Sequence, residues 1–214
     1  MVRRTKDEAL ETRERILDAA ERVFQQKGVS RTSLNEVAAA AGVTRGAIYW
    51  HFENKAELFD AMILRVCAPF ENLCAGPEIL VGKPDPLAIV RDMSLQFLQR
   101  MASDRHYCQV FEIAWHKCEY VDEMAAIRDK HLEVGSRYLD VLETALRDAQ
   151  AKGRVRADID PRQAAVGLRA LVDGLAINWT LDPTGFPLAD MAAGIIDSYL
   201  AGLGARFAAA HSAV

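Results

Sequence analysis

Several features of secreted and membrane proteins are missing from this sequence of 214 residues. The start, MVRRTKDEALETRERIL, is charged and lacks the apolar core of a signal peptide, so we expect no secretion. No apolar run reaches the roughly 18 residues that a membrane-spanning helix needs. The cysteines form no C-x-x-C pair and are predicted to be reduced thiols of a cytoplasmic protein. They are Cys67, Cys74, Cys108 and Cys118.

Glycine and proline are scarce, at 13 and 7 residues, and runs of β-branched residues are rare. Alanine and leucine are abundant instead, which favours an all-α fold. Apolar residues recur at helical spacing and predict nine helices and no strands. We expect them at residues 8–27 and 34–41, directly after Thr44, and at 55–73, 86–102, 104–117, 121–151, 161–181 and 188–209. Only AGPEILVGKPDP, residues 75–86, has the Gly/Pro content of a longer loop.

Charge is distributed unevenly along the chain, whose net charge is −4. Residues 1–58 hold ten Lys/Arg and nine Asp/Glu, so the acidic excess lies entirely in the remainder. Arg3, Arg4 and Lys6 form a small basic arm before the first helix. This weak polarity predicts an anion-binding N-terminal end and an acidic body.

The segment at residues 37–48 has the residue types of a helix-turn-helix. A small residue at Ala38 allows two helices to cross closely, and Gly42 supplies the positive φ of a short turn. Val43 and Ile48 then anchor the second helix on the first. Thr44 is in position to cap that second helix.

The second helix of this pair is predicted to bind DNA. If Ile48 faces inward, Arg45 and Tyr49 point away from the core, and the N-terminus of the helix is bare. Backbone N–H groups beside an arginine suit phosphates and base edges in a major groove. The predicted DNA contacts are Arg3, Arg4, Thr32, Ser33, Thr44, Arg45, Gly46, Ala47, Tyr49, His51 and Lys55. Phe52 and Leu58 return to the core; the alternative is that the aromatic run YWHF only fills a helical bundle.

The residue patterns of enzymes and metal sites do not occur. The five histidines show no H-x-x-x-H spacing, and the sequence has neither a glycine-rich phosphate loop nor a G-x-S-x-G motif. We therefore expect no catalytic residues, no metal ion and no cofactor.

The stretch GVTRGAIYWHFENKAEL resembles the signature of the TetR family of transcriptional repressors, in particular its multidrug-efflux repressors. RRTKDEALETRERIL is similar as well, and weaker similarity extends through WHKCEYVDEM (115–124) and VDGLAINW (172–179). The resemblance implies a helix-turn-helix DNA-binding domain at residues 1–54 and an effector-binding and dimerisation domain at 55–214. It also implies that the matching positions Thr44, Arg45, Gly46, Tyr49, His51 and Lys55 face DNA.

In the TetR family the body encloses an effector pocket, and Met and aromatic residues from residue 93 onward are candidates for its lining. With their neighbours they are Met93, Phe97, Phe111, Trp115, Tyr138, Val172, Asp173 and Ile177. Composition alone does not separate such a set from ordinary core. Asp173 lies in the nearly apolar run ALVDGLAINW, where a lone carboxylate is costly unless paired. It would hold a polar or cationic effector, or pair with a helix N–H or with Arg169.

The resemblance further implies that the last two helices pair with those of a second copy. Gly194, Gly202 and Gly204 beside an apolar stripe suit close helix approach, although the stripe could instead cover the chain's own core. The predicted function is a dimeric, ligand-responsive repressor on a pseudo-palindromic operator. It would control a multidrug efflux operon and be released by planar, hydrophobic, drug-like effectors. The alternatives are a regulator that answers a metabolite or thiol oxidation, and a helical small-molecule carrier or enzyme.

Overall fold

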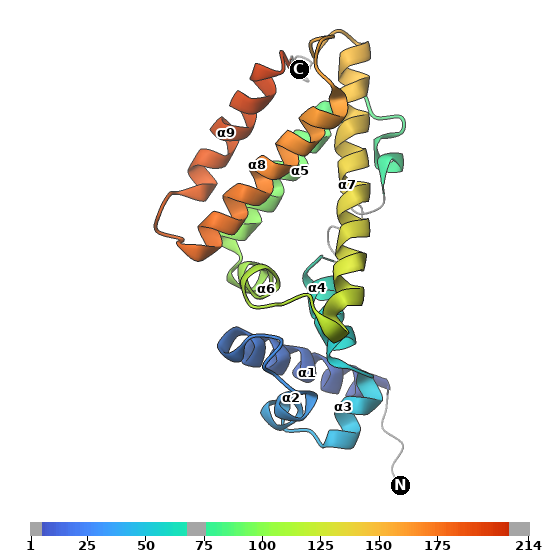
Figure 1. Cartoon of the computed structure of the whole chain (residues 1–214), viewed down its shortest axis with the longest axis vertical. Helices are drawn as coiled ribbons and strands as arrows, with labels where there is room; N and C mark the ends of the chain where they lie inside the picture. Colours follow the sequence, from blue (N-terminus) through green and yellow to red (C-terminus); the bar gives the residue numbers. More distant parts are fainter. Residues whose placement is uncertain (1–5, 68–75, 206–214) are drawn as a thin grey trace. The chain divides into compact units, whose positions relative to one another are not determined.

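The computed structural model describes residues 6–67 and 76–205, which contain nine α-helices, two 3-10 helices and no strand, as predicted (Figure 1). The α-helices are α1 (Lys6–Lys27), α2 (Leu34–Ala41), α3 (Arg45–His51), α4 (Lys55–Cys67), α5 (Pro86–Ser103), α6 (Arg105–His116), α7 (Ala125–Ala151), α8 (Pro161–Leu181) and α9 (Leu188–Gly202). The 3-10 helices are η2 (Pro77–Leu80) and η3 (Asp122–Met124). Over these ranges, no helix combines the length and the apolar character needed to cross a membrane.

The helices gather into two compact units. The first comprises Met1–Pro69 and His106–His131, and so holds α1 to α4, nearly all of α6, η3 and the start of α7. The second comprises Phe70–Arg105 and Leu132–Val214, and so holds η2, α5, α8, α9 and the rest of α7. The packing thus groups α4 and α6 with the first three helices, whereas the predicted boundary after residue 54 separates them. That boundary divides two functions and stays a prediction.

The core of the first unit forms where α1 lies across α2 and α4 (Figure 1). Apolar residues of α1 share one helix face, and Leu17 and Phe24 on it are fully buried. The Phe24 ring centroid lies 6.3 Å from that of Phe59 in α4. Phe52 and Leu58, at 1% and 0% exposure, return to this core as predicted.

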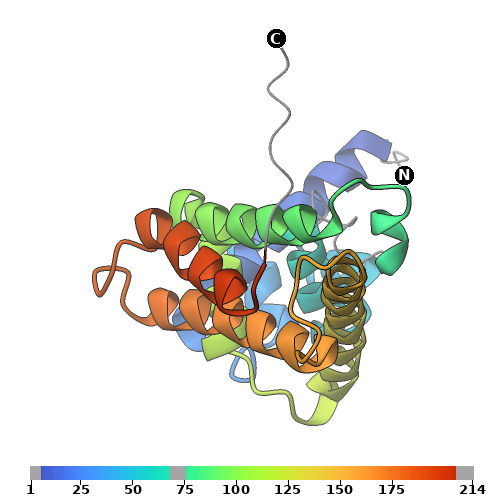
Figure 2. The ribbon, with the colours of Figure 1, turned by 90° about the horizontal axis from the view of Figure 1, so that it is seen from above.

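Helices α5, α8 and α9 lie side by side in the second unit (Figure 2). The inward face of α9 carries four buried residues at intervals of four: Leu188, Ala192, Ile196 and Leu200. The Asp197 carboxylate on α9 accepts hydrogen bonds of 2.5 and 2.7 Å from the Arg91 guanidinium on α5. Part of the predicted stripe on α9 therefore covers the chain's own core.

Two predicted helix boundaries are wrong. The last helix ends at Gly202 rather than Ala209, because Gly204 takes a φ of +79° and its N–H donates to the Ala201 carbonyl. Gly204 is therefore a helix stop and not a point of close helix approach. The segment from residue 121 is divided into η3 and α7 instead of forming one helix. The predicted continuation of the fourth helix to residue 73 lies outside the described residues.

Candidate nucleic-acid interface and effector region

Local contacts that the sequence specifies build the helix-turn-helix. The Ser33 Oγ accepts from the Glu36 N–H, and the Glu36 carboxylate accepts from the Ser33 N–H, so a reciprocal capping box begins α2. Gly42 ends α2 in the left-handed region at φ +65°, and the Val43 N–H donates to the Ala38 carbonyl at 3.0 Å. These bonds satisfy both ends of α2 and set the direction in which the chain enters α3.

Helix α3 holds one buried residue among exposed and half-buried neighbours. The Thr44 Oγ1 caps it by accepting from the Ala47 N–H at 3.2 Å, and Ile48 is fully buried. Arg45 and Tyr49 are exposed, and the guanidinium carbon of Arg45 lies 5.7 Å from the centre of the Tyr49 ring. As predicted, α3 turns an arginine and an aromatic ring away from the core.

The aromatic run in α3 is a surface feature and not a core. Trp50, whose role the sequence leaves open, is 72% exposed, and its ring centroid lies 4.5 Å from that of the half-buried His51. Of the four residues in YWHF, Phe52 is the buried one. The alternative in which the whole run fills a bundle is therefore wrong.

Two predicted DNA contacts are internal in this structure. Thr32 is 2% exposed, and its Oγ1 donates to the Gly28 carbonyl at 2.8 Å. Lys55 is 9% exposed; its Nζ donates to the Ser30 carbonyl at 3.3 Å and pairs with the Glu123 carboxylate at 2.8 Å. We therefore omit both from the candidate face. The candidates that remain among the described residues are Ser33, Thr44, Arg45, Gly46, Ala47, Tyr49 and His51.

Gly42 has a backbone conformation that favours glycine, whereas Gly46 does not, so alanine at each position gives a matched pair of variants. Gly42→Ala places a side chain at φ +65°, and we expect it to lower the free energy of unfolding by about 1 kcal/mol. Gly46 is helical with nothing within 4 Å of where a Cβ would stand, so Gly46→Ala should stabilise the fold slightly. Urea unfolding followed by circular dichroism measures both. An equal loss of stability in the two variants would contradict the assigned turn.

A polar cleft of about 430 Å³ opens in the first unit between the end of α1 and the segment that follows α6. Its lining residues are Gln25, Gln26, Gly28, Ser30, Arg31, His116, Lys117, Cys118 and Glu119. Pockets for drug-sized compounds are mostly apolar, and the predicted effector residues are absent from this lining. This cleft is therefore not the predicted effector site.

The predicted effector residues divide between the two units. On α6 in the first unit, Phe111 and Trp115 are half-buried, with ring centroids 5.0 Å apart. Tyr107, one turn earlier, is 3% exposed and lies 4.8 Å from Phe111, so α6 carries a row of three rings. The second unit holds the other candidates on α5, α7 and α8: Met93, Phe97, Tyr138, Val172, Asp173 and Ile177.

Asp173 has the arginine partner that the sequence offered as one alternative. The Arg169 Nε, one turn earlier on α8, donates to its carboxylate at 3.2 Å, and the Arg169 Nη1 donates to the Gly135 carbonyl on α7 at 2.5 Å. Partial burial still raises the pKa of Asp173. Burial also raises the pKa of Tyr138, whose hydroxyl hydrogen-bonds Ser94 on α5. Polar contacts thus link α8 to α7 through Arg169, and α7 to α5 through Tyr138, within the second unit.

Two of the described thiols, Cys108 and Cys118, do not have the properties of a redox sensor. Cys67, Cys108 and Cys118, the described cysteines, are half-buried and form no disulfide bond. Burial raises the pKa of Cys118 to about 11, and burial, with a smaller contribution from Glu112, raises that of Cys108. A raised pKa leaves little of the reactive thiolate at neutral pH. Control by thiol oxidation therefore finds no support in Cys108 and Cys118, and Cys74 lies outside the described part.

Two regions of the chain match known protein families. Residues 16–62 match the bacterial regulatory proteins of the tetR family. Residues 85–204 match the C-terminal region of MAATS-type transcriptional repressors. The first match contains the helix-turn-helix, and the second contains α5 to α9.

Similar proteins match over most of the chain. The HTH-type transcriptional regulator TtgR of Pseudomonas putida is 42% identical over 183 residues, 86% of this chain and 87% of TtgR. NalD, the secondary repressor of the MexAB-OprM multidrug efflux pump in Pseudomonas aeruginosa, has a TM-score of 0.84 and 33% identity over 92% of this chain and 98% of its own. A complex of SmeT with triclosan has a TM-score of 0.78 and 32% identity, over 90% and 91%. SmeT is the repressor of the Stenotrophomonas maltophilia multidrug efflux pump SmeDEF.

Proposed function

Because this chain belongs to the TetR family of transcriptional regulators and is related to multidrug efflux repressors, we propose that it represses an efflux operon as a dimer. In this proposal, planar and largely apolar compounds release it from a pseudo-palindromic operator. The family and its relatives are regulators and not enzymes, which removes the carrier or enzyme alternative. The roles of NalD and SmeT support the assignment to efflux.

The exposed pair on α3 carries the proposed DNA contact. Arg45 and Tyr49 face solvent while Ile48 anchors the same helix, so the pair can enter a groove without loss of core packing. Arginine is the side chain that most often recognises guanine, through two hydrogen bonds in the major groove. Arg3 and Arg4, which lie outside the described residues, remain proposed phosphate contacts, because a basic arm neutralises phosphates irrespective of sequence.

Exposed apolar residues on α8 and α9 support the proposed dimer. Val166 on α8 and Met191 on α9 are 48% and 44% exposed. On α9, Gly194 and Gly202 have open space where a Cβ would stand, so another helix could approach closely. A symmetric pair formed here has two α3 helices, which must reach successive major grooves about 34 Å apart.

The proposed effector contacts start from the two rings on α6. Aromatic rings stack on flat ligands and make few directional demands, so Phe111 and Trp115 suit compounds of varied structure. The SmeT complex supports this, because triclosan contains two aromatic rings. Release follows by population shift: a compound that binds one conformation better lowers the fraction of the chain that is competent for DNA.

Asp173 on α8 should select for charge among compounds that carry aromatic rings. We expect Asp173→Asn to weaken binding of tetraphenylphosphonium, an aromatic cation, by about two- to fivefold, the range for a partly screened ion pair. Binding of neutral triclosan should not change. Tryptophan fluorescence titrations without DNA measure both affinities. Asp129→Asn, which removes an exposed carboxylate from α7, is the control. If Asp173→Asn changes the affinities for both compounds by the same factor, Asp173 only pairs with Arg169 and does not select for charge.

Selection from a random pool of DNA duplexes tests the proposed function. The purified chain should enrich an inverted repeat. Fluorescence anisotropy should then show that the logarithm of the affinity falls linearly with the logarithm of the salt concentration. A protein that enriches no sequence is not the proposed repressor. An enriched sequence without two-fold symmetry would contradict the dimer.

A further inference from the structure

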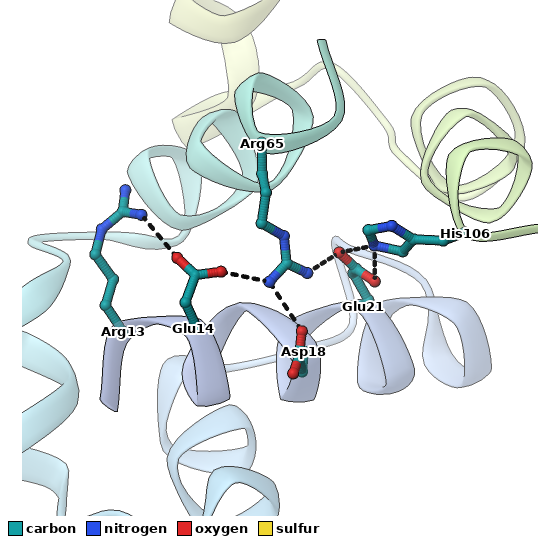
Figure 3. Close-up of polar contacts among 6 residues, drawn as sticks. All are labelled: Arg13, Glu14, Asp18, Glu21, Arg65 and His106. Carbon is teal, nitrogen blue, oxygen red and sulfur yellow. Dashed lines mark hydrogen bonds and ion pairs between the residues drawn. The ribbon is translucent and has the colours of Figure 1, made fainter. Parts of the chain in front are cut away.

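An acidic row on one face of α1 ends in a buried carboxylate (Figure 3). Glu14, Asp18 and Glu21 follow one another at intervals of four and three residues, which places them on the same side of the helix. The Glu14 and Asp18 side chains are 53% and 57% exposed, whereas that of Glu21 is 7% exposed. Glu21 therefore depends on its partners, because a buried carboxylate without them is costly.

Two side chains from different helices meet on Glu21 (Figure 3). Arg65, near the end of α4, donates through Nη2 to Glu21 and through Nη1 to Glu14 at 2.9 Å and to Asp18 at 2.8 Å. His106, in the first turn of α6, places its Nε2 3.0 and 2.9 Å from the two Glu21 oxygens. Glu21 thus joins α1, α4 and α6 at one point.

Further hydrogen bonds attach α6 and the residues after it to α1. The Gln25 Nε2 donates to the Glu112 carboxylate at 2.9 Å, and the Lys117 Nζ donates to the Gln25 carbonyl at 2.8 Å. The Val29 N–H donates to the Lys117 carbonyl at 2.8 Å. The attachment is polar, and its two side-chain bonds are only part-buried, so water can replace a lost partner at low net cost. Such a junction can transmit a displacement of α6 to α1, and its hydrogen bonds can form again afterwards.

We propose that Glu21 is the positioning residue that carries movement of α6 to the DNA-binding helices, an inference that rests on the proposed function. Helix α6 holds Phe111 and Trp115, the proposed effector contacts, as well as His106. Displacement of α6 pulls His106 against a carboxylate that cannot turn to water, so α1 must follow. Because Arg65 holds the same carboxylate, α4 follows as well. Helix α1 packs on α2, which leads into α3.

Asp18 is the matched control for this role. It lies on the same face of α1, carries the same charge and binds the same Arg65, but its exposed carboxylate has water as an alternative partner. Asp18→Asn therefore removes one charge and leaves the bond between Glu21 and His106 intact. Glu21→Gln changes the shared carboxylate itself, and His106→Ala removes only the partner from α6.

Hydrogen exchange in α6 measures the transmission, because coupling between two sites is reciprocal. Backbone exchange of residues 105–116 is followed by mass spectrometry, with and without the operator duplex obtained by selection. We expect operator binding to slow this exchange in the wild type and in Asp18→Asn. The operator-dependent change should be lost in Glu21→Gln and in His106→Ala.

Three other results of the exchange experiment bear on the role of Glu21. If Glu21→Gln does not fold, His106→Ala decides alone, because its half-exposed ring lies outside the core. If both variants keep the operator-dependent change, or if Asp18→Asn also loses it, Glu21 is not the residue that carries the movement. If the wild type binds no duplex, the proposed function fails and this inference fails with it.

Discussion

Alanine in place of Arg45 or Tyr49 will abolish specific operator binding and leave the fold intact. An arginine–guanine contact contributes roughly 1–3 kcal/mol, and a dimer makes it twice. We therefore expect Arg45→Ala to weaken operator binding by about a hundredfold or more. Neither side chain belongs to the buried face of α3, so the melting temperature should remain close to that of the wild type.

Fluorescence anisotropy with labelled operator measures the affinity, and circular dichroism follows the fold. Arg147→Ala is the control, since it removes a guanidinium that is 65% exposed from α7. Two results would contradict the proposed DNA-binding face. One is an Arg45→Ala protein that unfolds, and the other is an Arg147→Ala protein that loses as much affinity.

Phe111→Ala or Trp115→Ala will impair the response to compounds while operator affinity without compound stays nearly unchanged. Each ring is half-buried on α6, and the two rings lie one helical turn apart with their planes tilted by 47°. Loss of the contact between one ring and the compound should cost about 2 kcal/mol of binding free energy, so triclosan should bind roughly thirtyfold more weakly.

The control for this pair is Trp50→Ala, which removes an exposed ring from α3 and should leave compound binding unaffected. Isothermal titration with triclosan gives the affinities, and thermal melts report the fold. A Phe111→Ala protein that melts early but binds triclosan like the wild type shows that the rings are core. The effector site would then lie elsewhere.

The helix-turn-helix could be predicted from sequence because its determinants are close together in the chain. Each determinant lies in or next to the helix that it shapes: Gly42 ends α2, Thr44 caps α3 and Ile48 anchors α3 in the core. The same reasoning did not reveal the ion pair of Lys55, because its partner Glu123 is remote in sequence. A lysine beside a recognition helix favours DNA contact until that partner is known.

The contacts of Glu21 could likewise be predicted only in part, because its partners are remote in sequence. The spacing of Glu14, Asp18 and Glu21 is visible in the sequence and indicates an acidic face on α1. Its partners, Arg65 and His106, come from α4 and α6, and only the fold brings them together. Helix periodicity alone treats such a row as a solvated face.

The predicted effector set shows where helix periodicity stops being informative. Periodicity identified Phe111 and Trp115 as one aromatic face, and the structure shows these two rings next to each other. Met93 and Val172 are 8% and 3% exposed, which is equally typical of core residues. Apolar side chains have the same pattern in a core and in a pocket lining, so sequence alone does not separate the two.

One titration tests most directly whether a bound compound releases this chain from DNA. The affinity of the wild type for its selected operator is measured by anisotropy without compound and with saturating triclosan or tetraphenylphosphonium. We expect at least one compound to weaken operator binding by about fivefold or more, and operator to weaken binding of that compound by the same factor. If both compounds bind, as tryptophan fluorescence would show, yet leave operator affinity unchanged, bound compounds do not release this chain from DNA.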